Sequence, residues 1–264
     1  MKQRVITAVV ALLLFIPILW FGGLPLQLTA AALGIIGLYE LFHMKGLEIF
    51  SFEGVVAVLA MCALVLPVED WLPFIKGDDL DLFYFFVMIL LAAQVISKNA
   101  YTIDEAAFPV IATLYVGMGF KYLIAARHAG FIILLYALLV VWATDIGAYL
   151  IGRKFGKHKL APDISPNKTI EGFLGGIASA IVVSAAYVFA FGGGDDFVFS
   201  LPLMLFLTAI FSVFGQFGDL VESAIKRHYG VKDSGKILPG HGGILDRFDS
   251  LLFVFPLMHL IGLF

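Results

Sequence analysis

Apolar stretches of about 20 residues recur along the chain, separated by short segments rich in polar residues, Gly or Pro. A membrane-spanning helix needs about 20 mostly apolar residues. We therefore predict an all-α, polytopic integral membrane protein with about nine transmembrane helices. The split between the first two rests only on the Gly-Gly-Leu-Pro run at 22–25, so eight helices stay open as an alternative. The predicted helices cover residues 4–21, 25–42, 52–68, 80–97, 105–125, 130–151, 171–192, 199–221 and 248–264.

The connecting loops differ in charge. If the N-terminus is inside, the outer loops hold only Lys76, Lys121 and Arg127 of the 17 Lys and Arg residues, and are otherwise acidic. Because cytoplasmic loops carry an excess of Lys and Arg, we predict a cytoplasmic N-terminus and an outside C-terminus. The polar chemistry is then expected to face the cytoplasm, in a protein of the cytoplasmic (inner) membrane.

Composition supports the membrane assignment. Of the 264 residues 61% are hydrophobic and 14% are charged, and the mean hydropathy is +0.99. The net charge of −3 gives no basic field for nucleic acid. A single cysteine, Cys62, rules out an intrachain disulfide.

Charged residues are distributed unevenly between the two halves of the chain. Residues 1–129 form short-looped helices with few intramembrane charges, which we expect to pack and to face lipid. Residues 130–264 carry two long inner loops, 152–170 and 222–247. We predict that this C-terminal region is catalytic.

The end of the eighth predicted helix carries polar residues at helical spacing. Asp219, Ser223, Lys226 and Arg227 recur at i, i+4 and i+7 or i+8, which places them on one face. The simpler explanation is an interfacial acid paired with Lys226 or Arg227. A site for anionic groups is the functional alternative.

Two carboxylates stand three residues apart before the last helix. Asp246 and Asp249 flank Arg247 and would share a helix face, which is unfavourable unless a cation lies between them. Mg²⁺ prefers such an all-oxygen environment. Carboxylates that stabilise a helix N-terminus are the alternative.

The segment between these groups is rich in glycine and lysine. Lys232, Lys236, His241 and the glycines around them could bind a polyphosphate through backbone N–H groups and positive charge. A glycine-rich turn explains the same pattern. The Walker A spacing is absent.

The other inner loop is basic. We interpret Arg153 and Lys154 as topology determinants, although they could also attract anionic lipid head groups. The run 165–171 is typical of a helix start, and this would place Lys168 where anions are favoured.

Single acids also occur within or near the predicted helices. Asp145 lies in or at the edge of the hydrocarbon, with Tyr149 one turn on as a possible partner, and is a functional candidate. Glu40 and Glu222 are expected to be solvated acids near the interface.

Residues 223–249, SAIKRHYGVKDSGKILPGHGGILDRFD, resemble the signature of the phosphatidate cytidylyltransferases, also called CDP-diacylglycerol synthases. The runs GQFGDLVE (215–222), DIGAY (145–149) and KLAPDISPNKTIEG (159–172) are similar to that family as well. The resemblance covers roughly residues 145–249 and no charged position of the signature departs from it.

The resemblance implies an enzyme that joins CTP to phosphatidate and gives CDP-diacylglycerol and pyrophosphate. It also implies that the reaction requires Mg²⁺, possibly two cations, and that the protein is a homodimer. It places the metal on Asp219, Asp246 and Asp249. It implies that phosphate is contacted by basic residues: Lys168, Lys226, Arg227, Lys232, Lys236 and Arg247. Ser223, His241 and Asp145 complete the predicted site. The alternatives are the same reaction on another lipid phosphate, an ion or solute transporter that uses Asp145 and Asp219, and an enzyme that consumes CDP-lipids.

Overall fold

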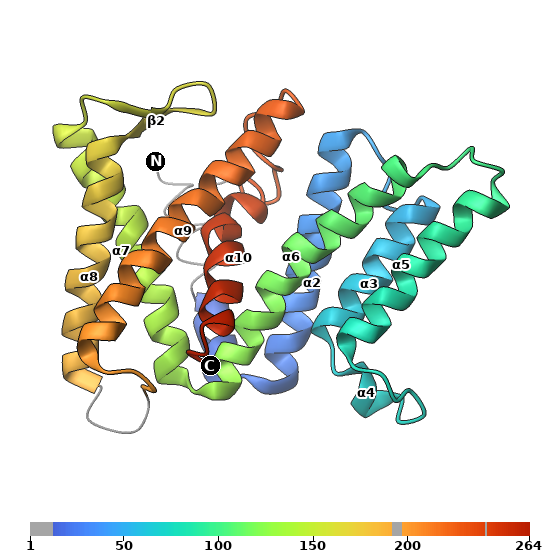
Figure 1. Cartoon of the computed structure of the whole chain (residues 1–264), viewed down its shortest axis with the longest axis horizontal. Coiled ribbons are helices and arrows are strands. Elements are labelled where there is room, and N and C mark those ends of the chain that lie inside the picture. The colour runs from blue at the N-terminus through green and yellow to red at the C-terminus, as the bar shows by residue number, and fades with distance from the viewer. Residues whose placement is uncertain (1–12, 192–196, 241) are drawn as a thin grey trace. The chain divides into compact units, whose positions relative to one another are not determined.

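The computed structural model describes residues 13–191, 197–240 and 242–264 (Figure 1). The chain forms two compact units. One contains Met1–Ile124 with Ser234–Leu245, and the other contains Ala125–Asp233 with Asp246–Phe264. The glycine-rich loop therefore contributes residues 234–245 to the unit formed by the N-terminal helices.

The first unit is helical. Residues 13–21 form a helix that ends before Gly22. Gly22 and Gly23 have φ of 64° and 53°, the left-handed region that favours glycine, so the chain breaks there and the first two predicted helices are separate. The remaining elements are α2 (Gly23–Lys45), α3 (Phe52–Val65), α4 (Val68–Trp71), α5 (Asp79–Ile96) and α6 (Ile103–Ala129), whose last turn belongs to the second unit.

Local sequence sets where these helices begin. The Ser51 hydroxyl accepts a hydrogen bond from Gly54 N at the start of α3. Asp78 and Asp81 form a capping box at the start of α5, each carboxylate accepting from the other residue's backbone N–H. These bonds satisfy amides that have no partner inside the helix.

The second unit combines helices with a small hairpin. Its elements are α7 (Phe131–Phe155), β1 (Lys159–Ala161), β2 (Ser165–Thr169), α8 (Ile170–Phe191), α9 (Leu201–His228) and α10 (Leu245–Leu260), whose first residue belongs to the first unit. The strands pair antiparallel, so the prediction of a purely helical protein is wrong at this point.

The helix start predicted within 165–171 is confirmed at the end of that run, where Glu171 lies in the first turn of α8. Residues 165–169 form a strand, and α8 begins only at Ile170. Pro166 favours an extended conformation at Ser165, and the backbone pairs with β1 instead of turning into a helix. Thr169 is the true cap, because its hydroxyl accepts from Gly172 N at 3.1 Å.

Among the residues that the structure describes, six helices are long and apolar enough to cross a membrane: α2, α5, α6, α7, α8 and α9. The protein is therefore a polytopic membrane protein. Helices α3 and α10, which match the third and ninth predicted spans, have 14 and 16 residues and are shorter than a typical span. The nine-helix count and the orientation stay predictions.

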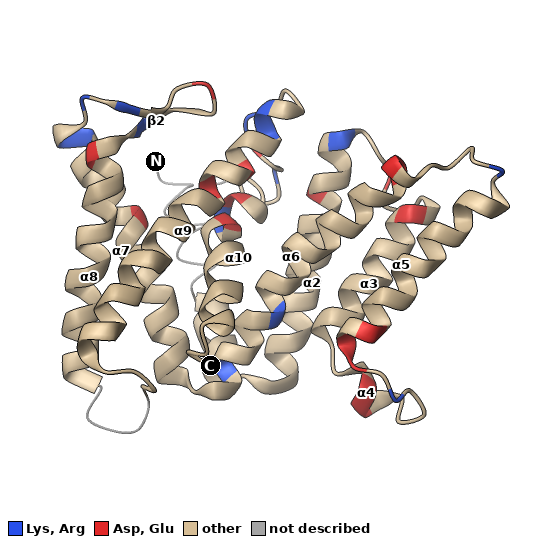
Figure 2. Ribbon diagram, in the orientation of Figure 1, with Lys and Arg blue, Asp and Glu red and all other residues tan. Residues whose placement is uncertain are grey.

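Close packing holds α7, α8 and α9 together. A Cβ on Gly175 of α8 would lie 2.5 Å from the Cβ of Ile151 on α7, so only glycine allows this approach. Buried hydroxyls bond α7 to α9: Tyr136 to Thr208 at 2.7 Å, and Thr144 to Ser212 at 2.8 Å. In the second unit, charged residues gather mainly at the hairpin end of these helices (Figure 2).

Candidate active site

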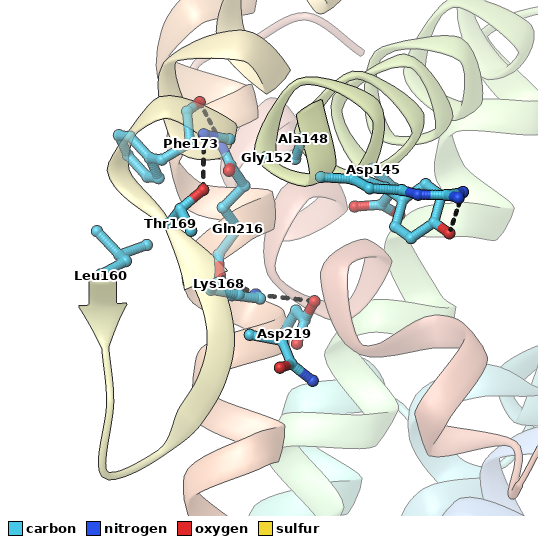
Figure 3. Close-up of a pocket in the computed structure, with 13 residues that line it drawn as sticks. Asp145, Ala148, Gly152, Leu160, Lys168, Thr169, Phe173, Gln216 and Asp219 are labelled. Carbon is cyan, nitrogen blue, oxygen red and sulfur yellow. Dashed lines mark hydrogen bonds and ion pairs between the residues drawn. The ribbon is translucent and has the colours of Figure 1, made fainter. Parts of the chain in front are cut away.

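A cavity of about 480 Å³ opens at the hairpin end of the second unit (Figure 3). It lies among α7, the hairpin, the start of α8 and the last third of α9. Its polar and charged lining residues are Asp145, Tyr149, Arg153, Asn167, Lys168, Thr169, Gln216 and Asp219. Three of the predicted site residues, from three elements, thus share one cavity.

An ion pair crosses this cavity. Lys168 Nζ, at the end of β2, lies 2.8 Å from Asp219 Oδ2 on α9, and donates to the Gln216 carbonyl at 3.4 Å (Figure 3). The side chains keep 24% and 34% of their exposure, so a ligand in the cavity has access to both. The hairpin therefore supplies a fixed cation to an otherwise helical site.

Asp145 faces the same cavity from α7. It is exposed within the protein, and it lies within electrostatic range of Asp219, Lys168 and Arg247. Ser223, one turn beyond Asp219, donates to Asp219 Oδ1 at 3.3 Å. The face predicted for Asp219 and Ser223 is thus confirmed.

A second cluster of charges lies where α9 approaches the start of α10. Lys226 Nζ lies 2.6 Å from Asp246 Oδ1 and also pairs with Glu222. The three side chains are 10%, 7% and 1% exposed. Glu222 was expected to be solvated, and that expectation is wrong, because Lys226 lies one turn further along the same helix and neutralises it within the protein.

The remaining predicted basic residues of this region have backbone partners or are exposed. Arg227 donates from Nε to the Ile164 carbonyl at 3.3 Å and from Nη1 to the Val231 carbonyl at 2.9 Å, which ties α9 to the hairpin turn. Arg247 and Lys232 are exposed.

The hairpin itself is held by Glu171. Its carboxylate accepts from the backbone N–H of Lys157 at 3.0 Å and of His158 at 3.2 Å, and lies 2.6 Å from His158 Nδ1. These contacts close the segment between α7 and α8 onto the first turn of α8. They fix the strand that carries Lys168.

The predicted metal ligands are not gathered into one cluster. Within the described ranges, no three His, Cys, Asp or Glu side chains are arranged to hold a metal ion. Asp219 and Asp246 are each paired with a lysine, whereas Asp249 lies within electrostatic range of Asp219, Glu222 and Asp145. Mg²⁺ is usually held by only one or two carboxylates together with ligand phosphates, so a single one of these carboxylates has the chemistry that Mg²⁺ prefers.

The glycine-rich loop of the first unit surrounds a different carboxylate. Glu40 of α2 is 1% exposed and accepts hydrogen bonds from this loop. It was expected to be solvated, and this too is wrong. Lys236 is exposed, and His241 lies outside the described residues.

Several cavity residues were missed by the sequence reasoning. Gln216 donates from Nε2 to the Phe173 carbonyl at 3.2 Å and so fixes α9 against α8. Asn167 and Tyr149 also line the cavity, Tyr149 having been considered only as a partner of Asp145. The i, i+4 spacing of Glu222 and Lys226 was a usable signal for their ion pair.

Comparison with known proteins decides the family. The model of the cytidylyltransferase family matches residues 2–264. The chain belongs to the cytidylyltransferase family. A phosphatidate cytidylyltransferase of Staphylococcus haemolyticus is 49% identical over 263 residues, covering 99% of this chain and 98% of the relative. Proteins of the same name from Staphylococcus saprophyticus and Staphylococcus aureus (strain COL) are 48% and 46% identical at the same coverage.

Proposed function

We infer that the chain is a CTP:phosphatidate cytidylyltransferase, a nucleotidyltransferase of phospholipid synthesis that forms CDP-diacylglycerol and pyrophosphate. The observation that carries this conclusion is identity of 46–49% along the whole chain to cytidylyltransferases that act on phosphatidate. The cavity with Lys168 and Asp219 supports it, because a reaction between two anions needs fixed positive charge.

The reaction is an in-line displacement at phosphorus. A phosphate oxygen of phosphatidate forms a bond to the α-phosphorus of CTP, and the bond from that phosphorus to the oxygen bridging the α- and β-phosphates breaks. That oxygen leaves with its electron pair as part of pyrophosphate. Phosphate is already a competent nucleophile, so the protein must mainly position the reactants and neutralise their charge.

Lys168 is the proposed phosphate contact within the cavity. Its ammonium is fixed against Asp219 and the Gln216 carbonyl and remains partly exposed, so an incoming phosphate can accept a hydrogen bond from the third N–H donor. Arg247, Arg227, Lys232 and Lys236 are further proposed phosphate contacts, as is His241. Asp145 and Ser223 would orient Asp219 and its ligands.

Lys226 has a different proposed role. It lies between Glu222 and Asp246 and is 10% exposed, so both carboxylates already engage its ammonium. We propose that it holds Asp246 in position at the start of α10.

Asp219, Asp246 and Asp249 would hold the Mg²⁺, possibly two cations. When bound, Mg²⁺ supplies positive charge that offsets the charge developing on the phosphate oxygens. Asp219 is best placed for this because it faces the cavity and keeps 34% of its exposure.

The membrane arrangement follows from the loop charges. Nine helices with a cytoplasmic N-terminus would place the hairpin and the loop after α9 on the cytoplasmic side of the inner membrane, where CTP is available. Phosphatidate would enter from the membrane. A homodimer is the proposed assembly.

The test is an assay of the purified protein in detergent micelles with phosphatidate, Mg²⁺ and α-labelled CTP. We expect the α-label to enter the lipid phase, pyrophosphate to appear, and Asp219→Asn to abolish turnover while its thermal unfolding midpoint is kept. Transfer of only the γ-phosphate would identify a lipid kinase instead. A panel of lipid phosphates tests whether the protein uses a substrate other than phosphatidate. If no label moves to any of them and the protein carries ions across liposome membranes, it is a transporter.

A further inference from the structure

The glycine-rich loop is organised around one buried carboxylate. Glu40 Oε2 accepts from the Ser234 hydroxyl at 2.9 Å and from Leu245 N at 2.9 Å, and Oε1 accepts from Ile244 N at 2.8 Å. These donors are 194 to 205 residues away from Glu40 in the chain. A single side chain of α2 thus holds both ends of the 234–245 loop.

Two of these donors belong to the start of a helix. Helix α10 begins at Leu245, so the N–H groups of Ile244 and Leu245 have no partner within the helix. The N-terminal end of a helix also carries partial positive charge, which favours a carboxylate. Glu40 therefore caps α10 from a remote part of the sequence, and these donors offset the cost of burying its charge.

Two glycines allow the loop to approach this closely. A Cβ on Gly243 would lie 2.3 Å from Glu40 Oε1 and 2.2 Å from the Ser234 hydroxyl oxygen. A Cβ on Gly235 would lie 2.6 Å from Glu40 Oε1. All three distances are shorter than a real Cβ atom allows, so at both positions glycine leaves room for the Glu40 carboxylate.

The N–H groups of Ile244 and Leu245, at the end of this loop, therefore already donate hydrogen bonds to a carboxylate of the protein itself. The loop bears the exposed Lys236, and it ends one residue before Asp246. We propose that Glu40 is a positioning residue, which fixes the 234–245 loop together with Leu245 and thereby sets where Lys236, a proposed phosphate contact, is held. The catalytic half of this proposal rests on the proposed function.

Limited proteolysis tests the anchoring without any assay of activity. Lys232 and Lys236 are exposed trypsin sites next to or within the loop. Glu40→Gln keeps the side-chain size and removes the charge. We expect it to speed cleavage at these lysines about tenfold, since cleavage tracks the population of the opened segment.

Two controls test whether faster cleavage is confined to the 234–245 loop and is caused by the change at Glu40. Glu48→Gln changes an exposed acid shortly after α2 and should leave the rate at Lys232 and Lys236 at the wild-type value. Cleavage at the exposed Lys157, beside the hairpin, should be equal in all variants. Faster cleavage at Lys157 as well would mean general unfolding and would overturn the proposal.

Kinetics test the catalytic half. We expect Glu40→Gln to lower kcat/KM for CTP about tenfold and to leave the KM for phosphatidate within about twofold of wild type, because Lys236, the proposed phosphate contact, would no longer be held in place. Faster cleavage with unchanged kinetics would overturn the positioning role. If the wild-type protein lacked CTP-dependent activity, the proposed function would fail while the cleavage result stood.

Gly243→Ala is a second variant that leaves Glu40 in place. Its added Cβ clashes only with Glu40 and Ser234 among the contacts nearest to that position. It should therefore reproduce the faster cleavage of Glu40→Gln if the loop is held by this contact. Cleavage at the wild-type rate in both variants would show that Glu40 does not hold the loop.

Discussion

Two buried glutamates, Glu40 in the first unit and Glu222 in the second, are each 1% exposed but have different kinds of partner. Glu40 accepts from two backbone N–H groups and one hydroxyl. Glu222 pairs with the Lys226 ammonium, which also holds Asp246. One carboxylate depends mainly on backbone groups and the other on a single side chain.

This difference determines how each site responds to mutation. A change of loop side chain leaves a backbone N–H in place unless the new residue is proline, so the contacts of Glu40 are robust to most such changes away from the close-packed Gly235 and Gly243. The Lys226 ammonium can be deleted, and its loss would leave two carboxylates facing each other in a largely buried place. Removing one partner of a buried pair is far more harmful than replacing the pair as a whole.

The largest effect is therefore expected for Lys226→Met. This change keeps the side-chain length but leaves Glu222 and Asp246 without their shared cation, and we expect it to destabilise the second unit by about 3–5 kcal/mol. Thermal unfolding in detergent measures this. Lys232→Met, at an exposed site, is the matched control and should be near neutral. Equal stability of the two variants would show that Lys226 does not stabilise the cluster with Glu222 and Asp246.

Much of the helical architecture was readable from the sequence, because membrane helices need long apolar runs and the polar breaks between them are short. Gly22 and Gly23 even marked the division between the first two helices correctly. The hairpin was not predicted, because its strands have only three and five residues.

The candidate site was predictable in part. Asp219 and Ser223 share a helix face, which periodicity shows directly. The ion pair of Lys168 with Asp219 is not local, and only the fold brings the hairpin to α9. Glu40 was misjudged for the same reason, because its donors lie far along the chain and no pattern near α2 indicates them.

A smaller effect is expected for Glu222→Gln, which tests whether Glu222 and Asp246 share the Lys226 ammonium. Lys226 keeps Asp246 as a partner in this variant, so we expect a loss of about 1–2 kcal/mol. The same change in the Lys226→Met background should cost less or even stabilise, since it removes one of two neighbouring carboxylate charges that have lost the Lys226 ammonium. A double-mutant cycle on the unfolding free energies measures this coupling. Additive losses would contradict the shared-cation arrangement.

The smallest effect is expected for Ser234→Ala. The change deletes the hydrogen bond from the Ser234 hydroxyl to Glu40 and leaves the Ile244 and Leu245 backbone donors in place, so we expect a loss of about 1 kcal/mol in unfolding free energy. Ser200→Ala, an exposed serine without a side-chain cap bond, is the control. A loss as large as that of Lys226→Met would mean that the hydroxyl, rather than the start of α10, is the main partner of Glu40, and the contrast between the two glutamates would disappear.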